Sequence, residues 1–97
     1  MYTAEEIKEI IKNYSWMSEA VKREENAENM SELVKNFSNK IKFIDKCFNN
    51  LTNDKDKYIL ELLFKGYTYH KVAKFVQLHQ SQISKRVESM AASFSSR

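Results

Sequence analysis

Hydrogen-bonding and cationic side chains gather near the C-terminal end of the chain, in a segment predicted to be a helix over residues 80–93. The apolar residues there recur at steps of four, three and four and are Ile83, Val87, Met90 and Phe94. This spacing keeps them on one side of a helix and leaves the other side polar. The polar side carries Gln80, Ser81, Gln82, Ser84, Lys85, Arg86 and Ser89, with one acid, Glu88. Amides pair with adenine edges, and cations pair with guanine edges and phosphates, so this is the chemistry that reading a DNA major groove requires.

A shorter helix is predicted immediately upstream, over residues 69–76. Thr68 precedes it and offers a side-chain oxygen as N-cap. Gly66 is the only glycine in the chain and lies where the preceding helix needs a C-cap residue without Cβ. Leu78 is the apolar residue of a tight connection to the next helix. The residues spaced to share one buried face of the 69–76 helix are Val72, Ala73 and Val76.

Residues 51–90 resemble the fourth-region helix-turn-helix of bacterial sigma-70-type factors, and the sigma-like helix-turn-helix of small phage late-gene regulators of the ArpU-like group. The positions that carry the resemblance are Gly66, Val72, Ala73, Leu78, Ile83 and Arg86. Two positions depart from the pattern: the turn glycine of the family falls on Gln77, and its serine N-cap falls on His79. We therefore expect a strained or differently shaped turn and a weaker cap. The resemblance implies a transcriptional regulator of a phage or mobile element, acting as an activator.

In such a regulator we expect the first turn of the 80–93 helix to enter the major groove. The side chains expected at the bases are Gln80, which pairs with adenine, and the auxiliary contacts Ser81, Gln82 and Ser84. Those expected at phosphates are Arg86, Lys71 and Lys74, with Thr68 and His70 near the backbone. Two roles stay open: Lys85 reaches guanine or a phosphate, and His79 touches a phosphate or caps the helix.

Composition and charge support an all-helical protein with a basic C-terminal half. The 97 residues include no proline and one glycine, and 30% are charged. Residues 1–50 carry 8 Lys/Arg and 9 Asp/Glu, a net charge of −1, whereas residues 51–97 carry 8 and 4, a net charge of +4. The basic half is thus the half with the candidate reading helix, which favours a nucleic-acid partner.

Signals for other classes of protein are absent from the sequence. A single cysteine, Cys47, excludes an internal disulfide and fits a reducing cytosol. The apolar runs are too short to span a membrane, and the N-terminus has no apolar signal core, so we expect a cytoplasmic protein without a membrane partner. Cys47, His70 and His79 do not have zinc-ligand spacing, and no catalytic arrangement or phosphate-cradling loop is visible. We expect no enzyme activity, metal or cofactor.

The first 50 residues are predicted to form a helical hairpin. One helix over residues 4–26 starts with a capping box at Thr3 and Glu6. Trp16 lies off its apolar stripe, either as a second packing contact or as an exposed anchor for a partner. A second helix, with Asn29 and Glu32 in the capping positions, is expected from near Met30 to about residue 49. Its apolar seam, at steps of three and four, is Val34, Phe37, Ile41, Ile44, Phe48 and Leu51. The side chains that widen this seam are Leu33, Phe43 and Cys47.

A face that wide often packs on two neighbours, which we expect to be the C-terminal half of the chain and a second copy of the protein. The remaining helices are expected over residues 54–65, 69–76 and 80–93, with Thr52 or Asn53 as the cap of the first and a frayed tail from Ser93. The sequence thus predicts an all-α fold. Residues 1–50 form a helical platform and candidate homodimerisation element, and residues 51–97 form a three-helix, sigma-region-4-like helix-turn-helix domain that binds double-stranded DNA.

Two other functions remain open. Because fold does not fix function, the same element could be a protein-interaction module that acts on RNA polymerase or a sigma factor with little DNA readout. The chain could also be a helical structural protein whose last helices only look like the motif.

Overall fold

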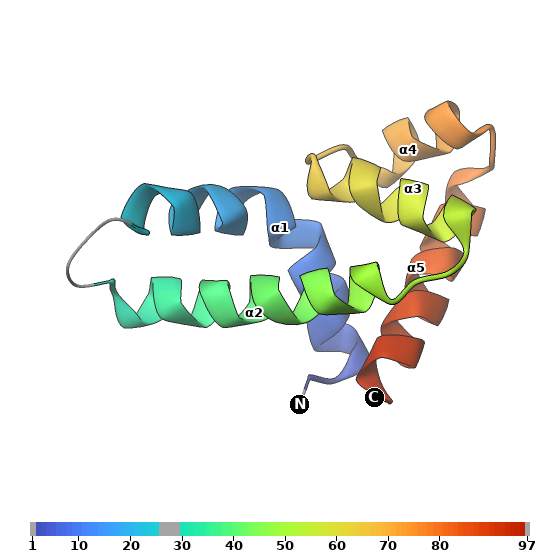
Figure 1. The fold of residues 1–97 in the computed structure, drawn as a ribbon. Coiled ribbons are helices and arrows are strands. Elements are labelled where there is room, and N and C mark those ends of the chain that lie inside the picture. The colour runs from blue at the N-terminus through green and yellow to red at the C-terminus, as the bar shows by residue number, and fades with distance from the viewer. Residues whose placement is uncertain (1, 26–29, 97) are drawn as a thin grey trace.

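The computed structural model describes residues 2–25 and 30–96. Within these residues the chain forms helices and no strand, which confirms the all-α prediction (Figure 1). The helices are α1 (Ala4–Glu24), α2 (Glu32–Asn49), α3 (Asp54–Phe64), α4 (Tyr69–Val76) and α5 (Gln80–Ser95).

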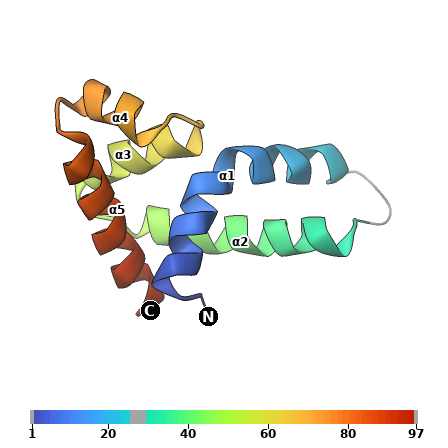
Figure 2. The same ribbon diagram turned by 180° about the vertical axis from the view of Figure 1, so that it is seen from behind.

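The first two helices form the predicted antiparallel hairpin. α1 changes direction along its length, and its second half runs beside α2 (Figures 1 and 2). The capping box of α1 is present: Glu6 N–H donates to Thr3 Oγ1 (3.2 Å), and Thr3 N–H donates to Glu6 Oε1 (2.9 Å). The side chains that α1 and α2 bury are Ile7, Ile10, Ile11 and Met17 of the first helix, and Val34, Ile44 and Cys47 of the second. The seam spacing identified Val34 and Ile44 correctly, and Cys47 widens the packed face as expected. The same expectation for Leu33 is wrong, because its side chain is 65% exposed.

Two predicted helix ends are wrong. α2 begins at Glu32 and not near Met30, because Ser31 has extended backbone and its hydroxyl accepts from the Val34 N–H (3.2 Å). The expected cap at Asn29 lies outside the described residues. At the other end of the chain, α5 continues to Ser95 and does not fray from Ser93. The reason is Phe94, whose fully buried ring anchors the last turn in the core.

A single hydrophobic core joins the two halves of the chain. It combines Ile11 of α1 and Ile44 of α2 with Ile59 of α3, Val72 of α4 and Val87 of α5, all of which are completely buried. α1 packs against α2, α3 and α5, so it lies between the rest of the hairpin and the C-terminal helices. The platform predicted from residues 1–50 thus shares its core with residues 51–97.

Aromatic contacts attach the hairpin to α3. Tyr14 of α1 stacks on Phe64 of α3 with ring centroids 3.9 Å apart, and its hydroxyl donates to Asp45 Oδ1 of α2 (2.7 Å). Burial of the phenol, and then the hydrogen bond to this carboxylate, raise the pKa of Tyr14 above its ordinary value. Trp16 is about half exposed, and its ring packs edge-on against Phe37 at 5.1 Å. Of its two expected roles, packing is present, and half of the indole still faces outward.

The connection from α3 to α4 uses the one glycine as predicted. Gly66 has φ +98°, a left-handed conformation that L side chains rarely adopt. The Tyr67 N–H reaches back to the Leu62 carbonyl (3.3 Å), which is the hydrogen bond of a Schellman C-cap. Asn53, one of the two expected caps, begins α3 by accepting from the Asp56 N–H (2.9 Å).

Candidate nucleic-acid interface

The connection between α4 and α5 is a three-residue turn through a left-handed residue. Gln77 has φ 58° and ψ 43°, and it is the only residue other than glycine with positive φ among those described. The Gln77 and Leu78 N–H groups both donate to the Ala73 carbonyl, the latter at 3.0 Å. A residue with a Cβ therefore holds a conformation that normally favours glycine, which is the strain expected from the departure at this position.

The cap of α5 is built from a histidine. Nδ1 of His79 accepts from the Ser81 N–H (3.2 Å) and lies 2.9 Å from the Ser81 hydroxyl. In return, the His79 N–H donates to Gln82 Oε1 (2.9 Å), which completes a reciprocal cap. A cap is therefore present, with the imidazole nitrogen as its acceptor. Of the two roles open for His79, capping is present, and the side chains of Ser81 and Gln82 take part in it.

The remaining polar residues of α5 differ in accessibility. Gln80 and Lys85 are exposed, and neither has a polar side-chain partner in the part of the chain that the structure describes. Ser84 is partly buried beside the fully buried Ile83. Gln80 and Lys85 are therefore the two residues of the first turns of α5 whose side chains remain available to a ligand.

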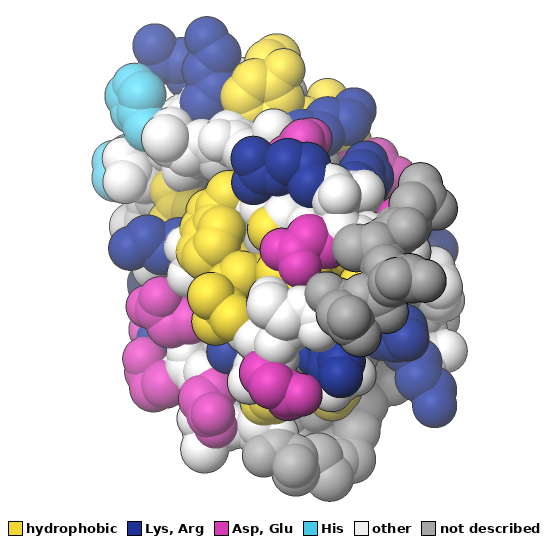
Figure 3. Space-filling view, turned by 90° about the vertical axis from the view of Figure 1, so that its left-hand side faces the viewer, with side chains coloured by type: hydrophobic (Ala, Val, Ile, Leu, Met, Phe, Trp, Pro, Cys, Tyr) yellow, Lys and Arg dark blue, Asp and Glu magenta, His cyan; other side chains and the backbone are white. Residues whose placement is uncertain are grey.

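α4 contributes exposed cations next to this helix. Lys71, Lys74 and His70 are all exposed, and Thr68 Oγ1 accepts from the Lys71 N–H (3.2 Å) as the predicted N-cap. Seen from the tip of the hairpin, histidine and Lys/Arg side chains lie at the top of the molecule, where α4 lies, and further Lys/Arg side chains lie lower on the same face among acidic ones (Figure 3).

Arg86 differs from the other cations because it is already paired. Its Nη1 donates to Asp56 Oδ1 in the first turn of α3 at 2.8 Å, and the two side chains are 36% and 21% exposed. The sequence suggested a phosphate as the partner of Arg86. No local signal connects the two residues, because they are 30 positions apart.

The ends of α4 and α5 also meet α1, which sequence reasoning left out of the site. A groove of about 520 Å³ is lined by Thr68 and Tyr69 at the start of α4 and Gln80 at the start of α5. Its charged lining comes from α1 and combines two cations, Lys8 and Lys12, with two carboxylates, those of Glu5 and Glu9. Burial raises the pKa of the Tyr69 phenol in this groove. The N-termini of α4 and α5 therefore open on the same groove, where both helix dipoles are positive.

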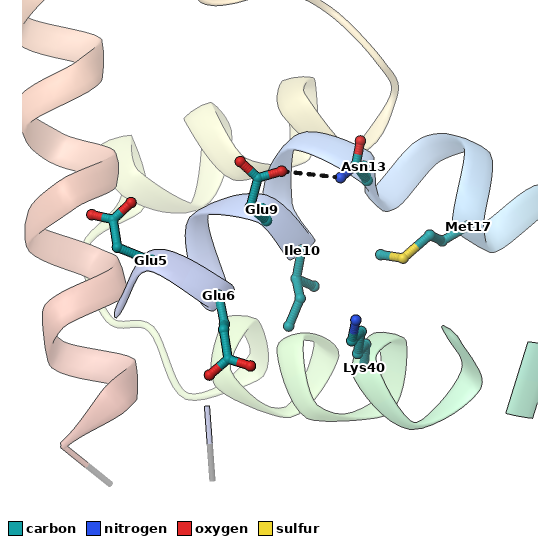
Figure 4. A pocket seen from close by; sticks show the side chains of 7 residues that line it. All are labelled: Glu5, Glu6, Glu9, Ile10, Asn13, Met17 and Lys40. Carbon is teal, nitrogen blue, oxygen red and sulfur yellow. Dashed lines mark hydrogen bonds between the residues drawn. The ribbon is translucent and has the colours of Figure 1, made fainter. Parts of the chain in front are cut away.

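A smaller cavity of about 250 Å³ lies between α1 and α2, and most of its charged lining is acidic (Figure 4). Three carboxylates line it, those of Glu5, Glu6 and Glu9, with a single cation, Lys40. Hydrogen bonds from the backbone and side chain of Thr3 lower the pKa of Glu6. Glu5 and Glu9 line both hollows, so the cations best placed to meet a polyanion are the exposed lysines of α4 and α5, Lys71, Lys74 and Lys85.

Comparison of the chain with models of protein families, with curated proteins and with solved structures gives no match. Within residues 2–25 and 30–96, no group of His, Cys, Asp and Glu side chains is arranged to hold a metal ion. No helix in the same residues is both long and apolar enough to cross a membrane. The candidate interface is therefore argued from its own geometry.

Proposed function

We propose that the protein is a sequence-specific DNA-binding transcriptional regulator in which α4 and α5 form a sigma-region-4-like helix-turn-helix. The observation that carries the proposal is the shared groove at the N-termini of α4 and α5, with the unpartnered Gln80 and Lys85 on one helix and the exposed Lys71 and Lys74 on the other. Helix N-termini and lysines bind phosphates, and a free amide at the start of α5 reads a base edge.

In this proposal the side chains divide into two groups. Gln80 reads adenine in the major groove, and Lys85 reaches guanine or a neighbouring phosphate. Lys71 and Lys74 hold the DNA backbone, with Thr68 and His70 close to it. Ser81 and Gln82 act mainly through the cap, because their side chains already bond to His79.

The test is selection of binding sites from random duplex DNA, followed by affinity measurements at several salt concentrations. Gln80→Ala is expected to relax one base position and cost about 1–3 kcal/mol there. Lys74→Ala is expected to weaken binding to all DNA sequences alike. It should also lower the salt slope, the slope of log affinity against log salt concentration, by the amount that corresponds to about one phosphate contact. The matched control is Lys55→Ala, an exposed cation of α3 outside α4, α5 and the hairpin, which leaves both quantities unchanged. If no sequence is enriched and binding stays weak at low salt, direct readout is refuted.

A single small helix-turn-helix buries limited area on DNA, so we also propose that two copies bind together through the α1–α2 hairpin. The exposed apolar side chains there support this: Trp16 is 52% exposed and Leu33 is 65% exposed. Light scattering at micromolar concentration, with and without the selected DNA, tests it. A monomer under both conditions excludes the homodimer.

A second candidate function is a protein-interaction module that acts on RNA polymerase or a sigma factor. The observation that favours it is the exposed aromatic pair of Tyr67 and Phe75, which are 40% and 47% exposed with ring centroids 5.3 Å apart. Exposed aromatic residues are enriched where proteins bind one another. Under this alternative, Phe75→Ala abolishes binding to the polymerase, Lys74→Ala has little effect, and binding depends only weakly on salt.

A further inference from the structure

We infer that Asp56 is a specificity-determining positioning residue of the interface, although it lies on α3 and contacts no DNA. Its ion pair with Arg86 holds α5 in one orientation and keeps the guanidinium away from the phosphates. This inference rests on the proposed function, and it replaces the phosphate role that the sequence suggested for Arg86.

Both partners of the pair are fixed by their surroundings. Asp56 lies in the first turn of α3, where its own N–H is held by Asn53 Oδ1 at 2.9 Å. Arg86 lies on α5 between Ile83 and Val87, which are completely buried and fix the helix against the core. The 2.8 Å contact between Asp56 Oδ1 and Arg86 Nη1 therefore joins two helices whose backbones are held in place next to the pair.

The pair supplies a directional contact that the apolar packing lacks. Burial of a hydrophobic stripe is not directional and tolerates small rotations of a helix, whereas a charge-assisted hydrogen bond has a required geometry. Within residues 2–25 and 30–96 it is the only ion pair between α3 and α5. The other ion pair to α5, Lys8–Glu88, is longer at 3.5 Å, and Lys8 shares its charge with Glu5 at 2.8 Å. Base readout is sensitive to helix orientation, so the pair affects specificity more than overall affinity.

The pair also decides which cations reach the DNA backbone. If Arg86 moved to a phosphate, the Asp56 carboxylate, which is 21% exposed, would lose its partner beside a polyanion. Arg86 therefore stays on Asp56 when DNA binds, and the salt dependence of binding comes from lysines such as Lys71 and Lys74.

The experiment compares the wild type with Asp56→Asn, Arg86→Met and the reversed pair D56R/R86D. For each full-length protein, affinities for the selected site and for random duplex DNA are measured over a series of salt concentrations, together with the free energy of unfolding. Asp56→Asn is expected to lower the ratio of specific to nonspecific affinity roughly tenfold. It should also raise nonspecific affinity and steepen the salt slope by about one phosphate, because Arg86 is released. Arg86→Met should lower the ratio similarly with an unchanged slope, and the reversed pair should restore the ratio.

Three results overturn the inference. One is a salt slope that falls by about one phosphate in Arg86→Met, which shows that Arg86 contacts DNA. Another is an unchanged specificity ratio in Asp56→Asn, which decides the question even if Arg86→Met does not fold. The third is a reversed pair that recovers the free energy of unfolding but not the ratio, which shows a purely structural role. A wild type with no sequence preference refutes the proposed function itself and, with it, this inference, so the two failures are distinguishable.

Discussion

The turn between α4 and α5 passes through Gln77, and replacing this residue by glycine is a direct test of the turn. In the structure its φ of 58° and ψ of 43° fall in the left-handed region, and Ala73 accepts the N–H groups of both Gln77 and Leu78. The Gln77 side chain is exposed, with no polar partner in the part of the chain described. Gln77→Gly therefore changes the backbone preference and removes almost no packing.

The size of the effect follows from two opposing contributions. An L residue in the left-handed region costs about 1–2 kcal/mol relative to its favoured conformations, and glycine avoids this cost. Glycine also increases the conformational entropy of the unfolded chain, which lowers stability by about 0.4–1 kcal/mol. The net expectation is a stabilisation of roughly 0.5–1 kcal/mol, which raises the unfolding midpoint of a domain of this size by about 2–8 °C.

The assay is urea and thermal unfolding followed by far-ultraviolet circular dichroism, with two matched controls. Gln77→Ala keeps a Cβ and therefore the left-handed cost, so it should not stabilise the protein. Ser89→Gly places glycine at an exposed position inside α5, where it should destabilise by about 0.5–1 kcal/mol. Together the controls separate the local backbone effect from the general effect of adding a glycine.

The reasoning is refuted if Gln77→Gly is as destabilising as Ser89→Gly, because the turn would then not require a left-handed residue. It is also refuted if Gln77→Ala stabilises as much as Gln77→Gly, since the side chain and not the backbone would be responsible. In either case the left-handed geometry of the α4–α5 connection would have to be abandoned.

Three other perturbations have defined outcomes. Gly66→Ala should destabilise the protein by about 1–2 kcal/mol in urea unfolding, because φ is +98° and the new Cβ would lie 3.3 Å from Ser15 Oγ. Adding Ser15→Ala to this variant should recover only the part of the loss that is due to that contact. Tyr14 has a raised pKa in the folded state, so on raising the pH this phenol ionises first in the unfolded chain. The contribution of Tyr14 to the free energy of unfolding is therefore complete below about pH 10 and is lost as the pH rises through the raised pKa. Tyr14→Phe should abolish this loss, as measured by unfolding at several pH values and by absorbance titration. Ile44→Ala should lower the free energy of unfolding by about 2–5 kcal/mol in the same urea assay, because Ile44 is fully buried. Leu33→Ala should change it by no more than about 0.5 kcal/mol, because Leu33 is 65% exposed. Equal effects would contradict the packing of the hairpin.

Part of the candidate site could be predicted from the sequence because its determinants are local. The exposure of Gln80 and Lys85 follows from their place off the Ile83–Val87 stripe of α5. The N-cap at Thr68 was equally readable, since its bond reaches only three residues along the chain. Capping was one of the two roles left open for His79, because imidazole is an uncommon N-cap acceptor, and the Gln82 side chain three residues later was a signal for it.

The contacts that position the site could not be predicted in the same way. Arg86 pairs with Asp56 across 30 positions, and Lys8 pairs with Glu88 across 80. Each pair depends on how two helices are rotated about their own axes and on where they cross. The spacing of residues within either helix does not specify this. The packing of α1 against α3 and α5 is of the same kind.

Within residues 2–25 and 30–96, the sequence by itself determined the local structure: the five helices, most of their ends, most of the side chains that each buries, and the glycine turn. These features depend on hydrogen bonds and side-chain spacing within about five residues, which the order of residues specifies directly. Only the tertiary structure decided that α1 unites both halves around one core, that Arg86 is occupied by Asp56, and that the N-termini of α4 and α5 share a groove with α1. Those outcomes depend on helix crossing and rotation, which result from packing all the apolar faces at once.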